Sequence, residues 1–126
     1  MNSPNPWLKF LEDDFKVLNV LEGSDAFRGQ CFHAQQLVEK LLKAELYKKG
    51  MPVPKIHDVL VLADTMNLNL PVSREELEFL SSVYIESRYP TDIGLLPQGE
   101  PTQNDSQQAL SIARKVYDFL HPKLIA

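Results

Sequence analysis

The sequence predicts an all-α fold, an antiparallel up-and-down four-helix bundle with one additional short helix. Four segments repeat apolar residues at steps of three and four, which is the spacing of an amphipathic helix. No segment shows the alternation of apolar and polar residues that marks a half-buried strand. Most connections are short, and short connections place successive helices side by side in opposite directions. Residues 1–126 are therefore predicted to form a single helical domain.

The longest predicted helix is the central one, from Ser24 to Gly50. Its apolar face is formed by Phe27, Cys31, Ala34, Val38, Leu41 and Leu42. Ser24 or Asp25 can cap its first turn, and Gly50 can close its last turn in the left-handed conformation. About 25 residues give a rod of roughly 38 Å, which is long enough to be the spine of a small bundle.

A helix of about 17 residues is predicted before the central one, with Asn5 as its N-cap and its end near Gly23. Its inward face carries Leu8, Leu11, Phe15, Leu18 and Leu21. Its polar side is predicted to carry Glu12, Asp13, Asp14 and Lys16. Trp7 and Phe10 widen the apolar arc, which indicates contact with more than one neighbour.

Two helices are predicted between the central helix and the long loop. The first is short and begins at His57 or Asp58, after a segment with two prolines. The second runs from Arg74 to Tyr89, opened by the capping-box pair Ser73 and Glu76.

The remaining part of the chain is predicted to be a loop followed by the last helix. Residues 91–105 are polar and rich in proline and glycine, which fits either a mobile loop or a lid over a site. The last helix is predicted over residues 106–120, because His121-Pro122 can stop it.

Composition excludes several classes of protein. The net charge of −4 gives no global field that would recruit nucleic acid or an anionic membrane. A single cysteine, Cys31, cannot form an intramolecular disulfide, and its place on the apolar face indicates a buried small side chain. The N-terminus lacks the features of a signal peptide, and no run approaches the ~20 apolar residues of a membrane span. We therefore expect a cytoplasmic protein without a membrane segment.

Arg88 is the first candidate site residue. It lies near Leu77, Ser81 and Tyr84 on the helical wheel, so a charged side chain is predicted on the inward face at a helix end. One interpretation is structural: the stem covers the edge of the core and the guanidinium reaches water. The other is functional: the guanidinium binds phosphate with two hydrogen bonds.

A second candidate is the polar stripe His33, Gln36 and Lys40 on the central helix, at steps of three and four. His33 is a candidate general acid or base, because imidazole changes charge near neutral pH, although a lone histidine on a helix edge is more often structural. Glu39 and Lys43 are predicted to form an ordinary surface ion pair. No metal site or cofactor is expected, since the sequence has no ligand spacing for a metal ion and no glycine-rich phosphate loop.

Three segments, in this order, resemble the HEPN domain family: Cys31 to Lys43, His57-Asp58, and Arg88-Tyr89-Pro90 with Asp92. The resemblance spans about residues 7 to 121, and what it implies is a helical bundle that usually forms a homodimer. Similar family members are often small prokaryotic proteins paired with a minimal nucleotidyltransferase in toxin–antitoxin-like systems. Catalytic members are metal-independent ribonucleases whose motif has an arginine and, a few residues later, a histidine.

This chain departs from that catalytic motif, because no histidine follows Arg88 before His121. Our leading hypothesis is a non-catalytic module that binds a nucleotide or a nucleotidyltransferase partner. Its candidate ligand-binding residues are Arg88, Tyr89, Asp92, His33, Gln36 and Lys40. The first alternative is an RNA-cleaving enzyme, a metal-independent endoribonuclease using Arg88 and His33 as catalytic residues. The second alternative is a structural adaptor bundle without a small ligand.

Overall fold

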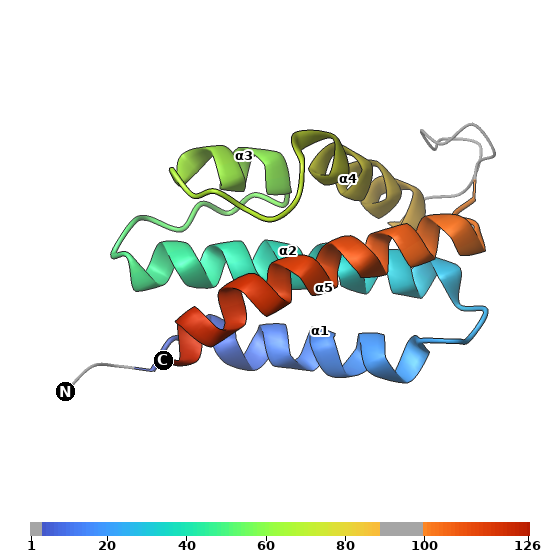
Figure 1. The fold of residues 1–126 in the computed structure, drawn as a ribbon, viewed down its shortest axis with the longest axis horizontal. Helices are drawn as coiled ribbons and strands as arrows, with labels where there is room; N and C mark the ends of the chain where they lie inside the picture. The colour runs from blue at the N-terminus through green and yellow to red at the C-terminus, as the bar shows by residue number, and fades with distance from the viewer. Residues whose placement is uncertain (1–3, 89–99) are drawn as a thin grey trace.

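The computed structural model describes residues 4–88 and 100–126 of the chain. It contains five α-helices: α1 (Trp7–Leu21), α2 (Phe27–Lys48), α3 (Val59–Thr65), α4 (Arg74–Arg88) and α5 (Gln103–Ile125). The described ranges contain no strand, so the predicted all-α class is confirmed. The long helices α1, α2, α4 and α5 alternate in direction along the chain, and α3 is the additional short helix (Figure 1). None of the described helices is both long and apolar enough to cross a membrane.

The helix α2 lies at the centre of the bundle and contacts each of the other four helices. The predicted apolar face is buried, apart from Phe27, which is half-buried. Burial also extends to polar residues on the other sides of α2: Gln30, Gln35, Glu39, Lys43 and Glu45. A buried polar group needs a hydrogen-bond partner, and the side chains of Gln30, Gln35, Glu39 and Lys43 have one within the protein. Oε2 of Glu45 is buried and has none among the described residues.

The turn between α1 and α2 differs from the prediction in one respect. The central helix begins at Phe27 and has no side-chain cap, so neither Ser24 nor Asp25 is its N-cap. The Ser24 hydroxyl instead donates to the Leu21 carbonyl (2.6 Å) and accepts from the Ala26 N–H (3.2 Å). Ser24 therefore holds the turn. At the other end of α2, Gly50 adopts φ +71°, as predicted for a left-handed helix end.

Capping residues explain where α3 and α4 begin. The Asp58 carboxylate accepts from the N–H of Leu60 at 2.9 Å and caps α3. Ser73 and Glu76 form the predicted capping box, since each side chain accepts from the other residue's backbone N–H (3.0 and 2.9 Å).

The last helix is longer at both ends than predicted. It begins at Gln103 because Thr102 and Asp105 form a second capping box, with hydrogen bonds of 3.1 and 2.9 Å. It also continues through Pro122 to Ile125. A proline removes one helical hydrogen bond and costs about 3 kcal/mol, but burial of Leu124 in the core offsets part of that cost. Near this end of α5, Nζ of Lys48 donates to the backbone carbonyl of Lys123.

Candidate functional site

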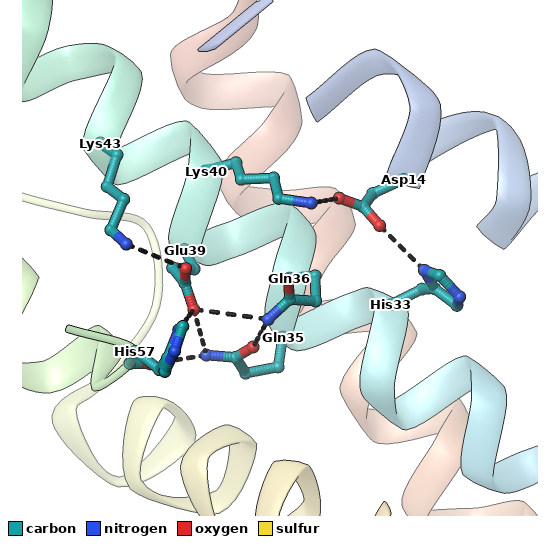
Figure 2. Close-up of polar contacts among 8 residues, drawn as sticks. All are labelled: Asp14, His33, Gln35, Gln36, Glu39, Lys40, Lys43 and His57. Atoms are coloured by element: carbon teal, nitrogen blue, oxygen red, sulfur yellow. Dashed lines mark hydrogen bonds and ion pairs between the residues drawn. The ribbon is translucent and has the colours of Figure 1, made fainter. Parts of the chain in front are cut away.

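Two buried carboxylates organise the polar residues around α2. Asp14 comes from α1 and Glu39 from α2, and their side chains are only 7% and 4% exposed. Figure 2 shows that they gather two separate groups of polar side chains. A buried carboxylate is stable only when it is paired and hydrogen-bonded, so each group forms around the charge it must satisfy.

Asp14 joins two of the predicted site residues. Its Oδ1 lies 2.8 Å from Nδ1 of His33, and its Oδ2 lies 2.5 Å from Nζ of Lys40. Both partners remain partly exposed, His33 at 28% and Lys40 at 19%. The three side chains form one cluster at the edge of the α1–α2 interface, which we call the Asp14 cluster.

The prediction that Asp14 lies on the solvent side of the first helix is therefore wrong. Asp14 follows Phe10 by four residues and Trp7 by seven, so it lies on the arc that these two aromatic residues widen. The spacing of Asp14 from these two aromatic residues was the sign in the sequence that its side chain lies on the buried side of the helix. A carboxylate on an apolar arc, opposite a helix that offers His33 and Lys40, can be buried because it has partners there.

Glu39 holds the second group. Its Oε1 meets Nδ1 of His57 at 3.0 Å, and its Oε2 meets Nζ of Lys43 at 3.0 Å. The predicted Glu39–Lys43 pair is present, but it is buried and not at the surface, because Lys43 is only 6% exposed and its ammonium lies 5.4 Å from the centre of the Trp7 ring. Gln35 completes the group by donating to the carbonyl of His57 at 2.7 Å. These contacts fasten the connection before α3 onto α2.

The predicted stripe of His33, Gln36 and Lys40 is divided between the two groups. Gln36 donates to Oε1 of Gln35 at 2.8 Å and to Oε1 of Glu39 at 3.4 Å, so it belongs with Glu39. Only His33 and Lys40 share a partner. Residues three and four apart on a helix point in similar directions, but their neighbours on α1 and in the connection before α3 decide which contacts form.

The remaining predicted residues are at or after the end of α4. Arg88 is the last residue of α4, while its side chain and all of Tyr89 and Asp92 lie outside the described residues. One turn before Arg88, the ring of Tyr84 stacks on Phe32 with centroids 5.8 Å apart. Phe32 precedes His33 and meets its ring edge-on at 5.1 Å. The turn of α4 that carries Tyr84 therefore contacts the part of α2 that carries Phe32 and His33.

The third histidine, His121, has its own partners between α1 and α5. Its Nε2 lies 2.5 Å from Oε1 of Glu12, and its ring stacks on Tyr117 at 4.4 Å. Tyr117 in turn stacks on Phe15 at 3.9 Å and donates its hydroxyl hydrogen to Glu12 at 3.2 Å. These contacts give His121 a structural place away from the Asp14 cluster.

Cys31 is not suited to nucleophilic chemistry. Its side chain is fully buried, and burial, with the Asp105 carboxylate as a smaller cause, raises the pKa of the thiol to about 12. The thiol is therefore protonated at neutral pH, which agrees with the interpretation of Cys31 as a small apolar core residue. Among the residues that the structure describes, no group of three or more His, Cys, Asp or Glu could hold a metal ion.

Neither of two open hollows on the described surface is lined by a residue of the Asp14 cluster. One of about 550 Å³ lies between the α1–α2 turn and α5, where Phe27, Gln30 and Arg114 are among its lining residues. Another, of about 880 Å³, is lined by residues from the start of α1 and the ends of α2 and α5. The partial exposure of His33 and Lys40 places the Asp14 cluster at the surface of the α1–α2 interface.

Comparisons with known proteins identify the family. A model of the HEPN domain matches residues 6–123. The crystal structure of TT1696 from Thermus thermophilus is 27% identical and superposes with a TM-score of 0.77, covering 98% of this chain and 99% of that one. The structure of ST0689, described as an archaeal HEPN homologue, shares the fold at 19% identity and a TM-score of 0.67, with coverage of 98% and 99%. A comparison with curated proteins gave no match. Because the family model spans nearly the whole sequence, this chain belongs to the HEPN domain family.

Proposed function

We propose that this chain is a HEPN-domain binding module that recognises a nucleotide through its phosphate groups at the Asp14 cluster. The observation that carries this proposal is the shared carboxylate, which holds a lysine and a histidine together at the protein surface. Lys40 has three N–H donors and His33 has a second ring nitrogen, so donor capacity remains after Asp14 is satisfied. Such donors bind phosphate oxygens well.

The position of Arg88 supports the same proposal. The last turn of α4 follows the Tyr84–Phe32 contact, one turn from the His33 region of α2. A guanidinium there would add the bidentate donor that phosphate recognition favours. The absence of a histidine in the segment after Arg88, together with the structural contacts of His121, favours binding over catalysis. The physiological setting we propose is that of a companion to a minimal nucleotidyltransferase in a toxin–antitoxin-like system.

The proposal is tested by titrating the purified protein with ATP in EDTA, following heat of binding and melting temperature. A ligand at 100 times its Kd should add about 2.7 kcal/mol of stability. We expect Arg88→Ala and Lys40→Ala to weaken ATP binding at least tenfold, whereas Arg114→Ala should bind normally. Arg114 is a matched control, because it pairs with Glu22 between α1 and α5. An absence of both heat and stabilisation with wild-type protein would reject nucleotide binding, and capture of a co-expressed nucleotidyltransferase would be the next experiment.

A ribonuclease is the second candidate function, and the Asp14–His33 contact is the observation that favours it. A carboxylate that orients a histidine is a common arrangement for a general base, and attack by a ribose 2′-hydroxyl needs such a base. The test is incubation of RNA with wild-type protein, His33→Ala and Arg88→Ala in EDTA, with His121→Ala as the control. Cleavage lost in the first two variants alone would support this candidate, and intact RNA with wild-type protein would reject it.

We also propose that the chain forms a homodimer, as the family resemblance implies. Phe10 supports this proposal, because it is 55% exposed on α1 and its ring lies 6.4 Å from that of Trp7. Sedimentation equilibrium should give twice the monomer mass of 14.4 kDa. A monomer at all accessible concentrations would contradict the proposal.

A further inference from the structure

Asp14 is the only residue of the Asp14 cluster that comes from α1, and it contacts both of the α2 residues. Within the described residues, the charged group in contact with His33 is Asp14, and Lys40 contacts the other oxygen of that carboxylate. Nζ of Lys40 donates to the other oxygen of the same side chain, and a carboxylate acts only as a hydrogen-bond acceptor. The ring nitrogen that faces it must therefore carry a hydrogen.

This requirement fixes the state of the imidazole. The nitrogen facing Asp14 is Nδ1, at 2.8 Å from Oδ1, so Nδ1 is the donor in both the neutral and the protonated ring. The neutral form then has its lone pair on Nε2. Figure 2 shows this second nitrogen on the side of the ring away from Asp14. No hydrogen bond to Nε2 is found among the described residues.

We infer that Asp14 is a positioning residue, which holds His33 in the Nδ1–H tautomer and turns Nε2 toward the ligand. The inference rests on the proposed function for the identity of the ligand. When His33 is protonated, Nε2–H donates to a phosphate oxygen. When it is neutral, Nε2 accepts a hydrogen bond from a hydroxyl group. The site therefore fits a ligand that carries phosphate beside a hydroxyl, which is the chemistry of a ribose phosphate.

The other two histidines provide internal references. Glu39 faces Nδ1 of His57 at 3.0 Å, so His57 should also be in the Nδ1–H form. Glu12 faces Nε2 of His121 at 2.5 Å, so His121 should be in the opposite Nε2–H form. One spectrum of the native protein thus contains both tautomers, each held by a carboxylate.

The experiment is long-range 1H–15N correlation NMR of the histidine rings in the 15N-labelled protein, recorded over a series of pH values so that the neutral form of each ring is observed. Signals are assigned with His33→Gln, His57→Gln and His121→Gln. We expect the Nδ1–H pattern for His33, and we expect Asp14→Asn to reduce it in favour of the Nε2–H form. Glu12→Gln, a carboxylate change on the same helix, should alter His121 and leave His33 unchanged.

An Nε2–H pattern for His33 in the wild type would overturn the inference, and so would an unchanged Nδ1–H pattern in folded Asp14→Asn. If Asp14→Asn does not fold, the tautomer of His33 in the wild-type protein tests the inference. Addition of ATP separates the inference from the proposed function. An ATP-induced change in the chemical shift of Nε2 of His33, with the hydrogen still on Nδ1, supports both the inference and the proposed function. Absence of any ATP-induced change rejects the proposed nucleotide site, while the tautomer still tests the role of Asp14.

Discussion

The surroundings of Tyr117 affect the stability of the protein at alkaline pH. Desolvation is the main cause, with the Glu12 carboxylate next, and together they raise the pKa of Tyr117 from 10.0 to about 12. In the unfolded chain the phenol ionises near 10, while in the folded protein it remains neutral. The contribution of Tyr117 to stability is thus complete below pH 10 and is lost as the pH rises from about 10 to about 12.

We therefore expect Tyr117→Phe to lose less stability than wild type between pH 10 and pH 12. The measurement is urea unfolding at several pH values. Cys31 contributes in the same direction, because its pKa rises from 9.0 to about 12, so Cys31→Ala should serve as the common background. Parallel stability curves for the two proteins would contradict a partly buried phenol at position 117 that stays neutral in the folded protein.

At the scale of the helices, the two capping boxes make a matched pair. Thr102 caps α5 and Ser73 caps α4, each with hydrogen bonds in both directions between the cap and the third helical residue. Loss of an N-cap side chain costs about 1 kcal/mol. We expect Thr102→Ala and Ser73→Ala each to lower the free energy of unfolding by roughly that amount.

Thermal unfolding followed by circular dichroism tests this expectation, and Thr65→Ala is a suitable control. Thr65 lies at the end of α3, and its hydroxyl donates to the carbonyl of Val61 without capping a helix start. A cost at Thr65 equal to that at Thr102 would mean that loss of the side chain, rather than loss of the cap, explains the effect.

Helix type and order were predictable from the sequence, whereas some helix boundaries were not. Apolar spacing identified the four long helices, because each buries a face at the helical period. The short helix was predicted from its start at His57 or Asp58, after a segment with two prolines. Thr102 and Asp105 have capping-box spacing, but the surrounding proline- and glycine-rich segment favoured a loop. Pro122 indicated a helix end, and only the packing of Leu124 shows why the helix continues.

The candidate site was less predictable, since it depends on pairs of residues far apart in the sequence. The periodicity of α2 placed His33 and Lys40 near one another, but no local rule supplied Asp14 as their common partner. Likewise, the spacing of Glu39 and Lys43 predicted an ion pair and could not show that both would be buried. Sequence patterns report which face a residue occupies, while burial also depends on what covers that face.

For the molecule as a whole, the buried Glu39–Lys43 pair connects several parts of the structure. Lys43 contacts Trp7 of α1, and Glu39 contacts His57 before α3. Removing one member of a buried pair leaves an unpaired charge and costs about 3–5 kcal/mol. We expect Glu39→Leu to destabilise the protein by that order and Lys43→Met in the same background to restore part of the loss.

A double-mutant cycle by urea unfolding measures this coupling. The exposed pair of Arg74 and Asp64, whose side chains are 60% and 55% exposed, is the control, with an expected coupling below about 1 kcal/mol. Equal coupling energies for the two pairs would show that burial adds nothing to the Glu39–Lys43 interaction.

The central position of α2 has a consequence for how the protein opens. Because α2 contacts every other helix, its amides reach solvent only when several helix interfaces are lost together. The seven-residue α3 contacts fewer neighbours and is free to open alone. In native-state hydrogen exchange, the α2 amides should exchange at the rate of global unfolding and respond strongly to denaturant. Those of α3 should exchange faster and respond weakly. Similar rates in both helices would show that the bundle opens as one unit.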